Sequence, residues 1–151
     1  MATRRGEAYR RFFQRLIDEL REGHGFTRAR VAQPRNFHHF ASGDAPGVYY
    51  DAFFAAGGRA VASVLIRRGW EDTRRIYGRL ERDKAGIESE FGSRLRWSNP
   101  RDVRACSIGV GRAGSIEGDA QTLEESHAWF VENLLRFKRV FGPRLRSLKD
   151  G

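Results

Sequence analysis

The segment from residue 80 to residue 97 carries the side chains best suited to chemistry. Lys84 lies at helical spacing on an otherwise apolar stripe, and Glu88 follows one turn later. In one interpretation the pair is no more than a weak i,i+4 contact, because a lysine stem can lie over apolar surface with its ammonium in water. A lysine buried in the stripe would instead need an acidic partner. Asp51 is the only acid within the three central predicted strands, so it is the candidate partner.

The hydrophobic pattern predicts the elements that would position these residues. Apolar residues recur at three- and four-residue steps in three stretches, which indicates helices. Aromatic and β-branched residues gather in five shorter stretches, which indicates strands. The order αβββαββα predicts an α+β fold, a single domain over residues 1–151 with an antiparallel or mixed sheet packed by helices. We expect flexible segments at 1–5, 42–47 and 149–151. The expected helices span 6–22, 70–91 and 122–141, and the expected strands span 36–42, 48–55, 59–67, 94–97 and 103–110.

The charge of the chain is its strongest global feature, with 28 Lys and Arg against 19 Asp and Glu and a net charge of +9. The excess of positive charge lies at the two ends of the chain. Residues 1–35 hold nine Arg against four acids, and residues 136–150 hold six bases against one acid. Such a field attracts polyanions, and neighbouring terminal helices would form one basic face. The candidate nucleic-acid-binding residues are Arg11, Arg15, Arg136, Lys138, Arg139, Arg144 and Arg146.

Three further features narrow the class of protein. The chain has no apolar run of about eighteen residues and no charged-then-apolar leader, so we expect a cytoplasmic protein without a membrane partner. Cys106 is the only cysteine, which excludes an internal disulfide and a zinc site built on several thiolates. His38 and His39 are neighbours on a predicted strand and point to opposite faces, which disfavours a shared metal ion. We expect no resident cofactor.

The stretch from Gly109 to Gly114 spells GxGxxG after a predicted strand. In a dinucleotide-binding fold this motif opens a helix whose N-terminus holds a pyrophosphate. Here the next capped helix begins only near Thr122, and no strand follows it to complete a βαβ unit. We therefore interpret the glycines as part of a flexible loop.

A motif around Lys84 resembles a bacterial family of unknown function, numbered four-two-six-eight among the domains of unknown function. The similarity covers nearly the whole chain, and its motif residues are Leu80, Lys84, Ile87, Glu88, Gly92, Leu95 and Trp97. In that family the domain often follows a PD-(D/E)XK-type nuclease domain, in proteins that look like DNA restriction or defence components. The resemblance implies a DNA context, with a separate nuclease or defence protein as a partner, and it gives no activity for the domain itself.

The αβββαβ order also resembles the core of PD-(D/E)XK nucleases, in which two acids hold Mg²⁺ and a lysine helps to position the attacking water. By that resemblance Asp51 would be the first acid. The third strand, which contains Ala62-Ser63-Val64-Leu65-Ile66, has neither the second acid nor the lysine. A nuclease would therefore need a migrated site, with Asp51 and Glu88 as Mg²⁺ ligands and Lys84 beside them as the third catalytic residue.

The sequence thus leaves three functions open. The leading hypothesis is a non-catalytic, nucleic-acid-associated domain of a bacterial defence or DNA-processing system, which binds the phosphate backbone through Arg-rich terminal helices and favours DNA. The first alternative is the Mg²⁺-dependent nuclease with a migrated site. The second alternative is a protein-interaction or homodimerisation module anchored by Trp70 and Trp129.

Overall fold

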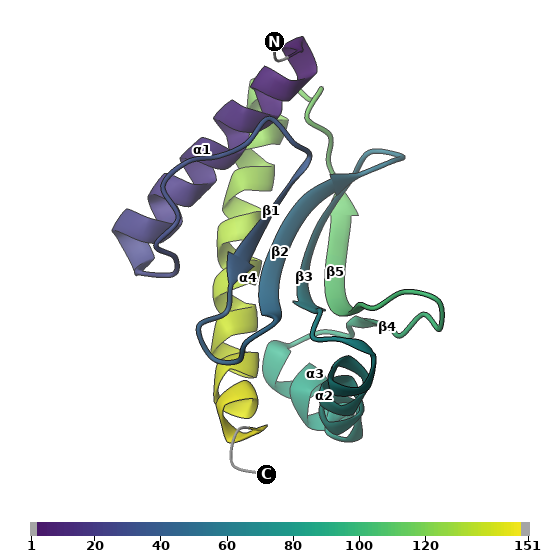
Figure 1. Cartoon of the computed structure of the whole chain (residues 1–151). Helices are drawn as coiled ribbons and strands as arrows, with labels where there is room; N and C mark the ends of the chain where they lie inside the picture. Colours follow the sequence, from purple (N-terminus) through teal and green to yellow (C-terminus); the bar gives the residue numbers. More distant parts are fainter. Residues whose placement is uncertain (1–2, 149–151) are drawn as a thin grey trace.

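A five-stranded antiparallel sheet carries helices on one face and at one end (Figure 1). The structure is a computed structural model, and it describes residues 3–148. The helices are α1 (Arg4–His24), α2 (Trp70–Arg82), α3 (Lys84–Phe91) and α4 (Ala120–Ser147). The strands are β1 (Phe37–Ala41), β2 (Val48–Ala55), β3 (Arg59–Ile66), β4 (Arg96–Ser98) and β5 (Cys106–Ala113). In space the strand order is β1-β2-β3-β5-β4, and the predicted α+β fold is confirmed.

The expected flexible ends fall partly outside the described residues, which exclude 1–2 and 149–151. Within the described part, α1 begins at Arg4 because Thr3 caps it. The Thr3 hydroxyl accepts a hydrogen bond from the Gly6 amide at 2.9 Å, which satisfies a backbone donor that has no partner inside the helix. At the other end Gly25 adopts a φ of 60°, the left-handed conformation that ends helices.

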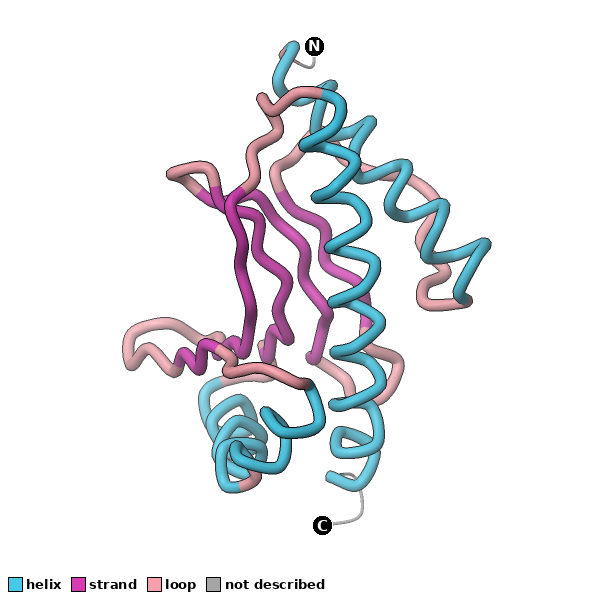
Figure 2. Tube along the Cα trace, turned by 180° about the vertical axis from the view of Figure 1, so that it is seen from behind, coloured by secondary structure: helices cyan, strands magenta, loops and turns pink. Residues whose placement is uncertain are grey.

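The core lies between the sheet and the two terminal helices. The Phe12 ring of α1 has its centroid 5.0 Å from Phe54 of β2 and 5.8 Å from Phe130 of α4. Tyr50 of β2 and Val64 of β3 point to the same side and are buried. Figure 1 views the sheet with α4 behind it, and Figure 2, turned by 180°, has α4 in front. Both long helices therefore cover one face of the sheet, and the other face carries no helix among residues 3–148.

The helix expected over 70–91 is divided at Asp83, which has a φ of −104° and a ψ of 25°. Leu80 of α2 and Ile87 of α3 are both buried on either side of this break. Lys84 becomes the first residue of α3 and is exposed. Of the two alternatives for Lys84, its exposure agrees with the one in which the ammonium lies in water, and it does not support a buried lysine that would need an acidic partner.

The 42–47 segment is anchored to α4, whereas the sequence indicated a flexible loop. Asp44 is 6% exposed, and its carboxylate contacts Arg146 Nη1 at 2.7 Å and Lys138 Nζ at 3.5 Å. Helix α4, which was expected to end at residue 141, continues through Pro143 to Ser147, because residues on both sides of the proline are buried in the core. Gly142 allows the close approach, because a Cβ there would lie 3.0 Å from Asp44 Oδ2.

Candidate functional site

Most of the basic residues expected to bind phosphate are matched by acids of the same chain. Arg11 and Arg139 are exposed and form no ion pair within residues 3–148. The other five are paired as Arg15–Glu124, Arg136–Glu132, Lys138–Asp44, Arg146–Asp44 and Arg144 with both Asp83 and Glu90. Their charge is largely neutralised locally, which weakens their attraction for phosphate.

The basic residues of the two termini also lie far apart. The terminal helices are neighbours, as the bidentate contact of Arg15 with Glu124 shows at 2.6 Å for each bond. That contact lies near the start of α4, whereas Lys138 and Arg146 lie in its last turns. Fourteen residues of α-helix separate Glu124 from Lys138, which corresponds to about 21 Å. The terminal helices therefore do not gather these charges at one place.

Glu88 has a structural role at the start of β4. Its Oε2 accepts a hydrogen bond from the Leu95 amide at 2.8 Å and one from the Trp97 indole at 3.1 Å. These two bonds, the Leu95 bond first, hold the pKa of Glu88 below its ordinary value. Lys84 Nζ lies 5.9 Å from the centre of the Trp97 ring. Both motif residues thus position the chain that enters β4.

We expect Glu88→Gln to lower the melting temperature by a few degrees, because an amide accepts the two bonds more weakly than a carboxylate does. Nucleic-acid binding should change little. Thermal unfolding followed by circular dichroism measures the first effect, and Glu71→Gln, at an exposed residue of α2 that forms no ion pair within residues 3–148, is the control. An unchanged melting temperature would show that Glu88 does not hold the β4 connection.

The structure does not bring Asp51 together with Lys84 and Glu88. In antiparallel pairing Trp97 lies opposite Ile108, which is fully buried on the helix-covered face. Asp51 lies in the adjacent cross-strand row, and successive residues of a strand point to opposite faces. Glu88, bonded to Trp97, and Asp51 are therefore on opposite sides of the sheet. No group of three potential metal ligands occurs within residues 3–148, so the migrated nuclease site has no geometric support.

The sheet face opposite α1 and α4, here called the open face, collects the side chains that remain accessible. One cross-strand row contains His39, Asp51, Ser63, Gly109 and Arg96 from β1, β2, β3, β5 and β4. On β2, Tyr49 and Phe53 flank Asp51 on the same face, and both are half-buried. Other members of the face are Phe37, Arg59, Val61, Leu65, Ser98, Ser107 and Gly111.

A groove runs over this face from β2 to β4, with a volume of about 610 Å³. Its floor is open because β5 carries two glycines there. A Cβ on Gly109 would lie 3.0 Å from Ser63 Cβ, and one on Gly111 would lie 2.6 Å from Arg59 Nη2. The first two glycines of the GxGxxG stretch are thus strand residues that leave space for the groove and for the Arg59 guanidinium. The flexible-loop interpretation of this stretch is wrong for these two positions.

Asp51 is the one acid of the open face, and its environment is unusual. The residue is 7% exposed, and burial raises the pKa of its carboxyl group to about 7. His39 Nε2 lies 3.4 Å from Asp51 Oδ1, yet Oδ1 is buried and makes no hydrogen bond. Burial also lowers the pKa of His39, and the nearby charge of Arg67 lowers it further. Neither side chain therefore carries a full charge near neutral pH.

The arginines around the open face have no acidic partners within the described part of the chain. Arg59 and Arg96 are exposed and line the groove. Arg67 follows β3 and lies close to His39, and the Arg35 guanidinium is 5.8 Å from the centre of the Phe37 ring. None of the four forms an ion pair among residues 3–148. The open face is therefore positively charged, in contrast to the neutralised helices.

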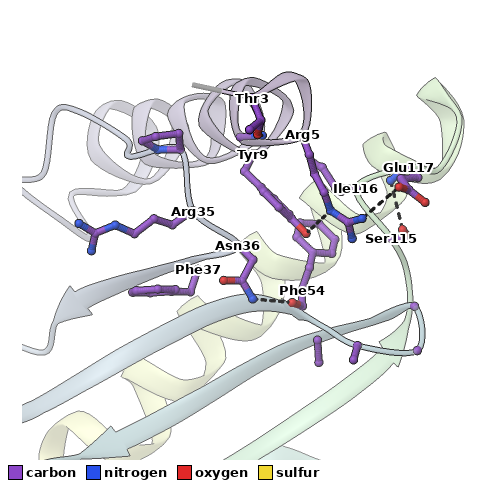
Figure 3. A pocket seen from close by; sticks show the side chains of 16 residues that line it. Thr3, Arg5, Tyr9, Arg35, Asn36, Phe37, Phe54, Ser115, Ile116 and Glu117 are labelled. Carbon is purple, nitrogen blue, oxygen red and sulfur yellow. Dashed lines mark hydrogen bonds and ion pairs between the residues drawn. The ribbon is translucent and has the colours of Figure 1, made fainter. Parts of the chain in front are cut away.

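A second cavity, of about 740 Å³, lies between the start of α1 and the β2–β3 hairpin. Figure 3 shows the Arg5 guanidinium between the Tyr9 hydroxyl and Glu117. Arg5 Nε donates to Tyr9 Oη at 3.3 Å, and Arg5 Nη1 lies 3.1 Å from Glu117 Oε1. Because these polar groups already satisfy one another, this cavity offers fewer free partners to a ligand than the open face does.

Fold and site together define a class of α+β domain with one helix-covered sheet face and one open, arginine-rimmed face. The chain belongs to the family "Domain of unknown function (DUF4268)", whose profile matches residues 8–145. This confirms the resemblance seen in the sequence. No curated protein matches the chain significantly.

Among solved structures, the chain is similar to YbjN, a candidate transcription regulator from E. coli. The two share 14% identity with a TM-score of 0.47, over 91% of this chain and 89% of that chain. These values are too low to carry a functional comparison. Separately, no helix among the described residues is both long and apolar enough to cross a membrane.

The sequence did not indicate Arg59, Arg67 and Arg96, because the distribution of charge along the chain does not show which residues share a surface. The alternation of Tyr49, Asp51 and Phe53 was a usable signal, since it places three large or polar side chains on one strand face. Trp70 and Trp129, the expected protein anchors, have other contacts. Trp70 lies under Arg74 and Arg104, at 4.7 Å and 5.6 Å, and Trp129 packs on the core.

Proposed function

We propose that this domain binds single-stranded nucleic acid, without cleaving it, across the open face of its sheet. One observation carries the proposal: arginines without acidic partners surround a sheet face that presents aromatic rings. Proteins that bind single strands combine these two features, because arginine attracts the phosphates and aromatic rings stack on the bases.

The geometry favours a single strand over a duplex. Phe53 and Tyr49 lie on the sheet surface itself, so a base must leave its stack in a duplex to contact them. Tyr49 and Phe53 are four positions apart on β2, which separates their Cα atoms by about 13 Å and gives each ring room for a separate base. DNA is the favoured form, because the family resemblance implies a role beside a nuclease in a bacterial defence or DNA-processing system.

The double variant Arg59→Ala/Arg96→Ala tests this proposal. We expect its affinity for a labelled ten-nucleotide oligo-dT to fall by about tenfold at low salt, since two phosphate contacts are lost. The slope of log affinity against log salt should become shallower by about 1.4, or about 0.7 for each contact to a single strand. Fluorescence anisotropy across a salt series measures both quantities.

The matched control is Arg11→Ala/Arg139→Ala, which removes the same charge from exposed arginines of α1 and α4 that lack ion pairs within residues 3–148. We expect this control to change the affinity by less than about threefold, through the general field alone. A loss of affinity in the control that equals or exceeds the loss in Arg59→Ala/Arg96→Ala would place the strand on the terminal helices and overturn the proposal.

A further inference from the structure

The outer edge of β5 is only partly covered by another strand. β4 pairs with three residues of β5, Ser107, Ile108 and Gly109, whereas β3 pairs with all eight residues on the other side. Figure 1 shows β4 beside one end of β5 and no strand beside the rest of this edge. Gly109 is buried, whereas Gly111 and Ala113 are exposed. An uncovered strand edge presents backbone groups with which another chain can pair.

The hydrogen-bond pattern shows which backbone groups lie on this edge. The Gly114 amide donates to the Gly58 carbonyl at 2.8 Å, directly after the last β3–β5 pair. Along an antiparallel strand, successive residues direct their N–H and C=O groups to opposite sides. Gly111 and Ala113 therefore direct theirs away from β3. The Ala113 carbonyl accepts a bond from Arg112 Nε at 3.0 Å, but the Gly111 N–H, the Gly111 C=O and the Ala113 N–H have no partner within residues 3–148.

On the helix-covered side of this edge, two apolar side chains are only half-buried. Val110 lies two residues after the buried Ile108 and therefore points to the same face. Val110 and Trp129 of α4 line a groove of about 540 Å³ beside the edge. The acid of this groove, Glu132, is already paired with Arg136 at 2.6 Å. A strand added here would bury its own apolar side chains against Val110 and Trp129.

On the open-face side, the same edge is positively charged. Arg96 lies opposite Gly109 at the start of β4. The Arg59 guanidinium lies over Gly111, since a Cβ on Gly111 would be 2.6 Å from Arg59 Nη2. Both arginines are exposed, and neither forms an ion pair within residues 3–148. Acidic side chains on a neighbouring strand would complement them.

We infer that the free edge of β5 binds an extended segment of a protein partner in which apolar and acidic side chains alternate. The segment pairs antiparallel to β5, in line with β4 and beyond its start at Arg96. Its acidic residues lie opposite Gly111 and Ala113 and face the open side, and its apolar residues face Val110 and Trp129. Main-chain hydrogen bonds hold such an added strand, and its alternate side chains provide the selectivity. The inference goes beyond the proposed function and does not depend on it.

The probe for this edge is a fluorescein-labelled peptide of alternating valine and glutamate, about eight residues long, which is the length of an ordinary strand. We expect the wild-type protein to bind it in fluorescence-anisotropy titrations at low salt. A peptide N-methylated at its glutamates lacks the N–H groups that face β5, so it should bind at least about tenfold more weakly. A peptide N-methylated at its valines is the matched control, because those N–H groups face away from β5, and it should bind like the parent.

The variant Ala113→Pro tests the same contact from the side of the protein. Proline removes one free donor and places its ring in the space of the added strand, so we expect about a tenfold loss of affinity. A strand edge whose N–H faces solvent accepts proline. Ala41→Pro is the matched control, because Ala41 is also the exposed last residue of an edge strand and directs its N–H away from its neighbour. Ala41→Pro should bind the peptide as the wild type does.

Circular dichroism verifies that both variants are folded, and if Ala113→Pro is not, the two methylated peptides decide with the wild-type protein alone. The inference is overturned if the parent peptide does not bind at up to about 1 mM. It is also overturned if the glutamate-methylated peptide binds as well as the parent, because side chains alone would then hold the peptide. An equal affinity of folded Ala113→Pro and Ala41→Pro would likewise exclude the β5 edge. Because oligo-dT binding is measured separately, each of these results leaves the proposed function standing.

Discussion

Asp51→Asn is expected to stabilise the free protein at alkaline pH by about 2 to 3 kcal/mol and to raise its melting temperature by about 4 to 12 °C. The folded pKa of Asp51 is about 7, against 3.8 for the ordinary group. This difference corresponds to roughly 4 kcal/mol of destabilisation when the carboxyl group is fully ionised, at about 1.4 kcal/mol for each tenfold change in proton affinity. Asparagine removes only part of this destabilisation, because its amide also lacks hydrogen-bond partners.

The direction in which the stability changes with pH follows from proton linkage. Between about pH 4 and pH 7 the folded state holds a proton on Asp51 that the unfolded state has released, so the stability of the wild type decreases as pH rises through this window. The groups facing Asp51 are His39 on β1, Ser63 on β3, and Arg96 and Arg59 along the groove. Of these, His39 is the other group that can change its charge, and burial lowers its pKa.

Melting curves of wild type and Asp51→Asn at about pH 4 and pH 8.5 measure this effect. The difference in melting temperature should be small at the lower pH and large at the higher pH. Asp102→Asn, which alters an exposed acid in the β4–β5 connection, is the control and should show no such trend. An equal difference at both pH values, or a less stable Asp51→Asn at pH 8.5, would contradict a raised pKa at Asp51.

The second large effect is expected from the aromatic rings of β2. Tyr49→Leu/Phe53→Leu should weaken the binding of oligo-dT by about thirtyfold or more, because stacking contributes about 1 to 3 kcal/mol for each base. Leucine keeps an apolar side chain at both half-buried positions, so the fold should be preserved. The salt dependence should remain close to that of the wild type, since no phosphate contact is removed.

Anisotropy titrations across the same salt series measure this result. Trp70→Leu is the control, since it removes an exposed aromatic ring at the start of α2, which does not line the groove. Wild-type affinity in Tyr49→Leu/Phe53→Leu would mean that the bases do not contact the open face. A changed salt dependence with an unchanged affinity at low salt would mean that the rings act only by positioning the arginines.

The sequence predicted the order of elements because its hydrophobic periods are clear. The stripe from Tyr9 to Leu20 is buried as expected, and the hairpin at Ala56-Gly57-Gly58 joins β2 to β3. The break at Asp83 could not be predicted, since the helical spacing continues across it. The helical path through Pro143 was also hidden, because it depends on the burial of Phe141 and Leu145 in the core.

The site was predicted less well, for a physical reason. Asp51 was identified as the one acid in the central strands, but its partners were sought on the following helix. Strand alternation does not by itself show that Asp51 and Trp97 point to opposite faces of the sheet. That conclusion also needs the register between β4 and β5. In the same way, the pairing of Arg144 with Asp83 joins residues 61 positions apart, and no local pattern indicates it.

The most direct test of strand binding at the open face is a titration of ¹⁵N-labelled protein with oligo-dT, followed by amide chemical shifts. We expect the largest shifts on β2, β3 and β5, around Phe53, Ser63 and Gly109. Amides near Arg11 and Arg139, on the exposed sides of α1 and α4, should shift little. Shifts concentrated on α1 and α4, with the sheet unchanged, would contradict binding at the open face.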